Sequence, residues 1–290
     1  MGATAIRPPH PNGAITVHDH HPTTPHIDAW LAAQELTKTD PGLEATDSFL
    51  DQIAGLAVDS EPAAKLLRTI RYKFEQGEHN GTVRLDAEDP IRNDAAAIVA
   101  QRLVNVGYLT TSKVVDGRLN FSLNQLSDAQ RDRLVSFLKG TWLERGVREV
   151  ARRALGSDAE VAGNVTVTDA AGRTYELDLV VALPGGGIVV IECKARNGVA
   201  RCLPRLRDVC DALGVDGPTA VMVAGGVEPE VVTDALAFHR ITVLAPSELD
   251  GHLRQLAGES ADALVAERTA PAEATVIALP SVTGALRRSS

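Results

Sequence analysis

The sequence predicts an α/β protein in which a mixed sheet is flanked by helices and is preceded by a helical, winged-helix-like N-terminal region. The first observation is the segment 175–195, where two apolar runs are joined by Pro184-Gly185-Gly186. Runs that are apolar on both parities are typical of strands buried on both faces. The second observation is a strand, helix, strand, helix, strand order that continues to residue 244 and implies parallel crossovers. The third is a helix followed by a hairpin turn at Asp116-Gly117.

The N-terminal part is predicted to be a flexible tail followed by helices. Residues 1–26 are rich in Pro, His and Thr without periodicity. The cluster His18-Asp19-His20-His21 could bind a metal, but incidental histidines in a tail are the favoured interpretation. Residues 27–89 form a helical region, because apolar residues recur at helical spacing and Ser60 before Glu61-Pro62 is a typical helix start. The predicted helices are 28–36, 48–58 and 61–76.

Residues 90–139 are predicted to form a winged-helix-like module. Asn93 can cap a helix over 94–106, and strands 109–115 and 118–123 flank the Asp116-Gly117 turn. Such a module could contact DNA through basic side chains at Arg102, Lys113 and Arg118. The acidic balance of the chain favours the alternative, a packing or dimerisation module with these charges in solvent.

A third domain is predicted over residues 140–257, followed by a loosely ordered extension at 258–290. Gly140 breaks a helix that resumes over 141–155, with Glu144 at the border of its apolar stripe. A helical stretch follows residue 198, and Pro204 suggests that its regular part starts near there. The other expected elements are strands at 161–168, 219–223 and 241–244 and helices at 229–238 and 247–256.

The hairpin at 175–195 places charges opposite each other. If Pro184, Gly185 and Gly186 form a three-residue loop, Asp178 faces Glu192, and Lys194 lies on the same side of its strand as Glu192. Two opposed carboxylates repel unless a cation lies between them, and Mg²⁺ is typically held by one or two carboxylates. The alternative is a salt-bridge cluster at a strand end. A register slip of one residue would separate the carboxylates.

These residues carry a resemblance to a known family. Asp178 followed by Glu192-Cys193-Lys194 resembles the D…(D/E)-x-K signature of the PD-(D/E)xK nuclease superfamily. The closest likeness is to the nuclease half of CARF-linked CRISPR ancillary endonucleases. The pieces that carry it are 137–144, 176–178, 191–194 and 206–214, within residues 95–250. The chain departs from these relatives because residues 1–90 are too short and too helical for a CARF domain, so no nucleotide activator is carried over.

The resemblance implies a metal-dependent endonuclease that cuts nucleic acid, DNA rather than RNA being favoured, in antiviral defence. Mg²⁺ or Mn²⁺ would be bound by Asp178, Glu192 and the backbone carbonyl of Cys193. Lys194 would orient the attacking water or stabilise charge on the phosphorus, and the product would carry a 5′-phosphate. Glu144 would act at the site directly or through water, or else form a surface pair with Arg148.

Basic side chains next to the signature suggest phosphate binding. Arg201 and Arg205 stand four residues apart on the predicted helix, and Arg196 comes just before it. Such a row could contact the scissile or flanking phosphates, and a solvated basic face is an equal alternative.

Composition limits the functional classes. The 290 residues carry 29 Lys and Arg against 38 Asp and Glu, for a net charge of −9. Non-specific duplex binding should therefore be weak and salt-sensitive. Three cysteines, no apolar run long enough for a bilayer and no signal peptide predict a reduced, cytoplasmic protein with no membrane contact. We expect a homodimer. The alternative function is a non-catalytic nucleic-acid-binding or regulatory protein on a nuclease-like scaffold, and a sequence-specific restriction-type enzyme is a third possibility.

Overall fold

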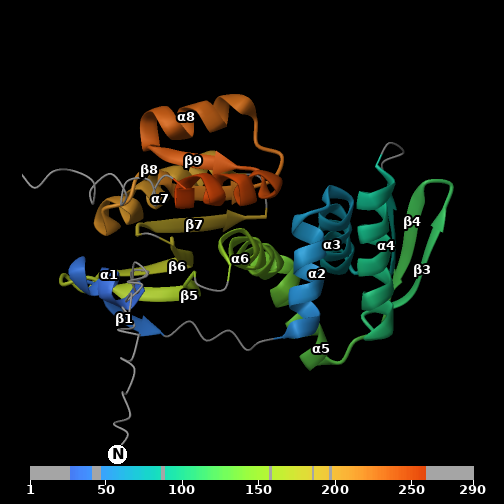
Figure 1. Ribbon diagram of the computed structural model, residues 1–290. Coiled ribbons are helices and arrows are strands. Elements are labelled where there is room, and N and C mark those ends of the chain that lie inside the picture. The colour runs from blue at the N-terminus through green and yellow to red at the C-terminus, as the bar shows by residue number, and fades with distance from the viewer. Residues whose placement is uncertain are drawn as a thin grey trace, which may run out of the picture.

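The computed structural model describes residues 27–40, 47–85, 89–156, 159–184, 186–195 and 198–258. It confirms an α/β architecture with a mixed six-stranded sheet and flanking helices, beside a helical lobe (Figure 1). The sheet order is β1-β5-β6-β7-β8-β9. These strands are β1 (Thr37–Asp40), β5 (Val161–Thr168), β6 (Thr174–Ala182), β7 (Ile188–Lys194), β8 (Gly217–Ala224) and β9 (Ile241–Leu244). The predicted tail at 1–26, with its histidines, and nearly all of the predicted extension lie outside the described residues.

The hairpin of β6 and β7 has the predicted register. Val180 pairs with Val190, and the ladder runs from Leu179–Ile191 to Ala182–Ile188. The Leu183 N–H donates to the Gly187 carbonyl at 3.0 Å, which closes the three-residue loop. The register follows from the sequence because both strands are apolar on both parities and only the Gly-rich segment suits a turn.

The C-terminal half of the sheet is parallel, as predicted. β7 pairs with β8 and β8 with β9 in parallel, so both connections are crossovers that contain a helix, α7 (Val199–Leu213) and α8 (Pro229–His239). A short 3-10 turn (η2, Pro246–Glu248) leads into a last helix over residues 249–258.

Helices cover both faces of the sheet. Buried residues of α1 (Ile27–Ala33), α7 and α8 pack with one face in a single cluster. The other face packs against α6 (Trp142–Leu155) and the last helix. That second cluster continues without interruption into the helical lobe, so the lobe and the sheet share one core.

The helical lobe contains three helices and a small sheet. Its helices are α2 (Ser48–Val58), α3 (Glu61–Glu75) and α4 (Pro90–Asn105). The predicted hairpin is present as β3 (Leu109–Val115) and β4 (Arg118–Leu123), and β2 (Asn80–Arg84) joins it in the order β2-β4-β3. In this part of the described chain a single helix, α4, separates β2 from β3. The winged-helix assignment stays a prediction.

The lobe is joined to the sheet through a kinked helical segment. α5 (Asp128–Ser136) leads into a π-helical turn (η1, Phe137–Thr141), where Gly140 breaks the helix with φ of 154°, as expected. α6 then crosses α2 closely. A Cβ on Gly146 would lie 2.8 Å from both the Ala54 carbonyl oxygen and the Val58 Cβ, so only glycine fits at this crossing.

One predicted helix start and the interpretation of Pro204 were wrong, and two strands were not expected. α4 begins at Pro90, because Asp89 rather than Asn93 caps it and accepts from the Arg92 N–H at 3.0 Å. α7 spans Val199–Leu213, as expected for the helical stretch, but it is regular from Val199, so Pro204 lies inside the helix rather than in its first turn. Strands β1 and β2 were not expected, since neither has the alternating apolar pattern of a strand. No helix among the described residues is long and apolar enough to cross a membrane.

Candidate active site

The candidate site lies where β6 and β7 separate. The Asp178 carboxylate accepts a hydrogen bond from the Cys193 backbone N–H at 2.7 Å. A regular antiparallel ladder would give that N–H to a backbone carbonyl of β6. The carboxylate has therefore replaced a rung of the ladder and lies in the gap between the two strands.

The backbone of β6 is irregular at this point. Leu177 belongs to the core on the α7 side of the sheet and Leu179 to the core on the α6 side. Residues two apart in a regular strand share a face, so the strand changes face at Asp178. Asn164 lies across from Asp178 on β5, in the gap between the Gly163–Leu179 and Val165–Leu177 pairs, with φ of 51°. The irregularity thus involves both strands.

Glu192 and Lys194 lie on β7, on the same side of the strand. Their side chains form an ion pair, with exposed fractions of 20% and 32%. Because the charged groups remain partly accessible at the end of an otherwise buried strand, they can meet a ligand without unfolding of the core.

Two carboxylates repel each other at the site. Burial and the charge of Glu192 raise the pKa of Asp178 to about 7, even though the Cys193 N–H and Lys194 favour its ionised form. Burial lowers the pKa of Lys194, but the hydrogen bond and charge of Glu192 outweigh this and raise it overall. A cation bound beside Asp178 would relieve the same repulsion.

These side chains line a cavity of about 380 Å³ between the sheet and α7. Arg201 and Arg205 reach it from α7, and both are exposed. Their role in phosphate binding stays a prediction. Arg196 lies outside the described residues. Glu176 also lines the cavity, so three acidic and three basic side chains surround it.

Glu144 is placed differently from the other predicted residues. It lies in the first turn of α6, which covers the opposite face of the sheet, and it does not line this cavity. Its carboxylate Oε1 lies 3.9 Å from where a Cβ on Gly140 would stand. Burial raises the pKa of the Cys193 thiol, and the negative charges of Asp178 and then Glu144 raise it further. An active-site role for Glu144 stays a prediction.

The groups present suit a hard divalent cation. Carboxylate and carbonyl oxygens are the ligands of Mg²⁺ and Mn²⁺, and the predicted set contains two carboxylates and one carbonyl. The Cys193 carbonyl faces the same side as its N–H, which points to Asp178. Among the described residues no three His, Cys, Asp or Glu side chains are arranged to hold a metal.

One residue near the site was not anticipated from the sequence. Asn164 interrupts an apolar strand, and Asn is among the few residues that adopt positive φ readily. The Asn within the strand next to the hairpin was the feature of the sequence that could have indicated the irregularity at Asp178.

Comparisons with known proteins bear on this region. A model of the nuclease-related domain family (NERD) matches residues 139–205. The structure resembles Can2 from Sulfobacillus thermosulfidooxidans, solved in complex with cyclic tetra-adenylate, with a TM-score of 0.52 and 15% identity over 79% of this chain and 60% of that one. Protein VC1899 from Vibrio cholerae matches with a TM-score of 0.48 and 18% identity over 80% of this chain and 61% of that one. A comparison with curated proteins gives no match.

The predicted resemblance to nucleases of the PD-(D/E)xK type is confirmed by the family model and by the fold shared with Can2. The matched segment contains Glu144, Asp178, Glu192 and Lys194. At 15% identity the likeness to Can2 is one of fold. This chain spans about three fifths of the length of the two matched structures, at 60% and 61%.

Proposed function

We propose that this chain is a divalent-metal-dependent endonuclease that hydrolyses phosphodiester bonds in nucleic acid, with DNA favoured, in defence against foreign nucleic acid. One observation carries the proposal. Asp178, Glu192 and Lys194 of the D…E-x-K pattern line a single cavity, and they share it with two arginines from a neighbouring helix. The nuclease-related match over the same residues supports it.

Each side chain has a role in this proposal. Asp178, Glu192 and the Cys193 carbonyl hold Mg²⁺ or Mn²⁺, and a bound ion would supply Lewis-acid polarisation of the phosphodiester and a lowered pKa of water. Lys194 exchanges its contact with Glu192 for the attacking water or the developing negative charge on the phosphorus. The lysine is suited to this because it is already positioned beside the carboxylates.

Arg201 and Arg205 bind the phosphates that flank the scissile bond. Both are exposed on α7 and line the cavity, and neither forms an ion pair with a described residue. Free guanidinium groups beside a carboxylate pair match the charge of a phosphodiester backbone. Glu144 takes part from the other side of the β7 end, in proximity to Cys193.

A cleavage assay tests the proposal. The intact chain is incubated with labelled single- and double-stranded DNA and RNA in Mn²⁺ or Mg²⁺, beside Lys194→Ala and the control Lys38→Ala. Lys38 lies on the distant edge strand β1 and pairs with Asp28 at 3.3 Å. We expect metal-dependent cutting by the native chain and the control, and none by Lys194→Ala. Undiminished cutting by Lys194→Ala refutes the assigned role.

The alternative function, a non-catalytic nucleic-acid-binding protein, makes a different prediction. It predicts no cutting of any substrate and no heat of metal binding in calorimetry. An enzyme that awaits an activator would still bind metal, and Asp178→Asn would abolish that binding. The homodimer is likewise a proposal, which light scattering of the intact chain decides.

A further inference from the structure

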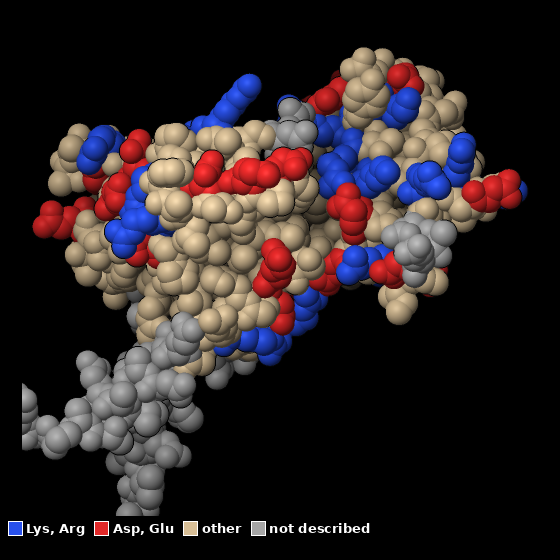
Figure 2. Space-filling view, turned by 90° about the horizontal axis from the view of Figure 1, so that it is seen from above, with Lys and Arg blue, Asp and Glu red and all other residues tan. Residues whose placement is uncertain are grey.

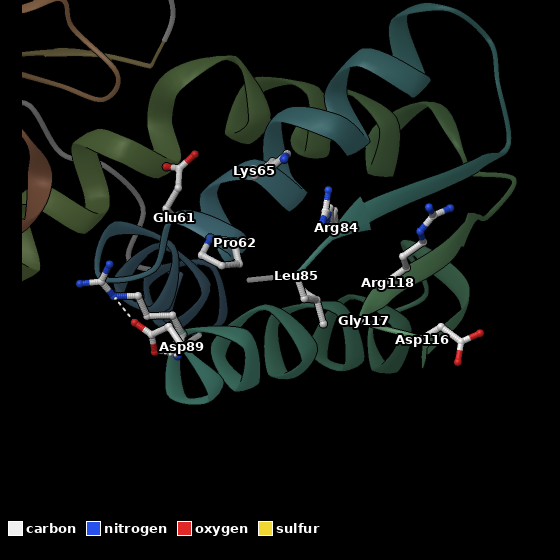
Figure 3. A pocket seen from close by; sticks show the side chains of 10 residues that line it. Glu61, Pro62, Lys65, Arg84, Leu85, Asp89, Asp116, Gly117 and Arg118 are labelled. Atoms are coloured by element: carbon white, nitrogen blue, oxygen red, sulfur yellow. Dashed lines mark hydrogen bonds and ion pairs between the residues drawn. The ribbon is translucent and has the colours of Figure 1, made fainter. Parts of the chain in front are cut away.

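The helical lobe carries a second large hollow, distant in sequence from the candidate active site. It has a volume of about 770 Å³ and lies between the first turns of α3 and α4, the end of β2 and the turn between β3 and β4 (Figure 3). Its lining is charged, and it contains no aromatic residue. The hollow is therefore suited to charged groups rather than to an apolar ligand.

The acidic side chains of this hollow are largely neutralised. Glu61 pairs with Arg68, and Asp89 pairs with Arg92 at 3.1 Å. Asp116 lies in the β3–β4 turn, where Figure 3 shows its carboxylate directed away from the hollow.

Three cations of the hollow keep their charge uncompensated. Lys65, Arg84 and Arg118 line it and form no ion pair with any described residue. Figure 3 shows their side chains rising on the same side of the hollow. Three cations without an ion pair thus line the hollow, while the remaining carboxylate points away from it, so the hollow is suited to an anion.

Two of these cations are placed against each other. Arg84 on β2 pairs directly with Arg118 on β4 in the antiparallel ladder. Like charges directly opposite each other in a sheet are destabilising. Nothing in the described fold offsets this cost, whereas a bound anion between the two guanidinium groups would.

The outward face of the small sheet also carries cationic side chains and no carboxylate among its described positions. Arg84, Thr82 and Asn80 are its exposed positions on β2, and their ladder partners on β4 and β3 share the face. The described positions of this face include cations and neutral hydrogen-bonding groups but no carboxylate. They are Asn80, Thr82, Arg84, Thr111, Lys113, Val115, Arg118, Asn120 and Ser122.

The exposed side of α3 runs from this hollow toward the end of β7. Lys65, Arg68 and Tyr72 follow one another along that side at helical spacing. Arg68 and Tyr72 line a further hollow of about 410 Å³ together with Ala195, the residue that follows Lys194. Tyr72 is 56% exposed, and the Lys73 ammonium lies 5.7 Å from the centroid of its ring, so the ring is accessible in a cationic environment. In the view from above, Lys and Arg gather over the helical lobe, whereas acidic residues form a row over the sheet lobe (Figure 2).

We propose that the exposed side of α3 and the Arg84–Arg118 pair bind a single-stranded segment of nucleic acid that extends toward the end of β7, where Glu192 and Lys194 lie. Phosphates contact Lys65, Arg84 and Arg118, and a base stacks on Tyr72. Single-strand binding sites combine a cationic groove with aromatic rings on which bases stack. The inference rests on the proposed nuclease function for its substrate class, and it assigns a binding role to residues outside the nuclease-related segment.

The experiment measures binding without cleavage. Fluorescence anisotropy of a labelled 20-nucleotide single strand and of the matching duplex is followed in EDTA over a range of salt concentrations. The variants are Arg84→Gln/Arg118→Gln and Tyr72→Ala. The controls are Arg152→Gln/Arg254→Gln, which removes the same charge from exposed helix surfaces, and Tyr72→Phe, which keeps the ring. Thermal unfolding checks that each variant is folded.

We expect the arginine variant to bind the single strand about tenfold more weakly, with its salt slope reduced by about 1.4 because two phosphate contacts are lost. Tyr72→Ala should lose about 5- to 150-fold, and Tyr72→Phe should retain affinity. Unchanged affinity and slope in the arginine variant overturn the proposal, as does tighter binding of the duplex or equal competition by inorganic tripolyphosphate. Because binding is read in EDTA, loss of these effects is distinguishable from failure of the nuclease function, which the Lys194→Ala cleavage assay tests.

Discussion

The pKa of Asp178 gives a quantitative prediction for the substitution Asp178→Asn. Burial and the Glu192 charge raise this pKa from 3.8 to about 7. An unfolded aspartate therefore ionises first as the pH rises, and the folded state loses stability between about pH 4 and pH 7 and then levels off. About three pH units at 1.36 kcal/mol each give a ceiling of about 4 kcal/mol. Asparagine removes this cost and its carbonyl oxygen can still accept from the Cys193 N–H.

The assay is urea unfolding of both proteins from pH 5 to pH 8.5 in metal-free buffer. We expect Asp178→Asn to be more stable than the native chain at pH 8, by up to about 4 kcal/mol, with the advantage shrinking toward pH 4. Asp211→Asn is the control of opposite sign, because the hydrogen bond with Arg207 lowers the pKa of Asp211. Removal of the Asp211 carboxylate should lower the free energy of unfolding at pH 8. Parallel pH profiles for Asp178→Asn and the native chain would refute the reasoning about the site.

Three further predictions concern packing, capping and substrate binding. Gly146→Ala should destabilise the chain by about 1–3 kcal/mol in urea unfolding, since its Cβ meets α2 at 2.8 Å, and Gly55→Ala, with open space around it, should not. Ser60→Ala should cost about 1–2 kcal/mol, because the buried hydroxyl caps α3 at the Ala63 N–H and donates to the Arg92 carbonyl at 2.8 Å. Arg201→Ala/Arg205→Ala should raise the KM for cleavage severalfold while the melting temperature stays unchanged, and a lower kcat at constant KM would contradict a purely phosphate-binding role.

Much of the sheet could be predicted because its signals are local. The β6–β7 register depends on a Gly-rich turn between two doubly apolar runs, and the parallel strands depend on the helices between them. Strands β1 and β2 could not be predicted in the same way. Thr37–Asp40 and Asn80–Arg84 are edge strands, and their conformation is imposed by the strands they pair with rather than by their own pattern.

Sequence spacing brought some residues of the candidate site together, but it did not predict the backbone geometry around them. Sequence spacing placed Asp178, Glu192 and Lys194 on adjacent strands, and they do share a cavity with Arg201 and Arg205. The face change at Asp178 lies across from a positive φ at Asn164 of a different strand, and no alternation pattern encodes such an irregularity. The position of Glu144 could not be predicted either. Helical spacing places it at the edge of the apolar face of its helix, but it does not specify which face of the sheet that helix covers.

The core shared by the helical lobe and the sheet determines how the protein unfolds. The cluster that contains Ile53 and Leu66 of the lobe also contains Leu179 and Ile191, which flank the candidate site. Heat or denaturant should therefore remove both parts in one cooperative transition, with a single calorimetric peak. Inactivating substitutions should accordingly appear in α2 and α3, at positions that contribute no atom to the chemistry. In such variants, loss of activity would follow the fraction of folded molecules rather than a changed rate constant.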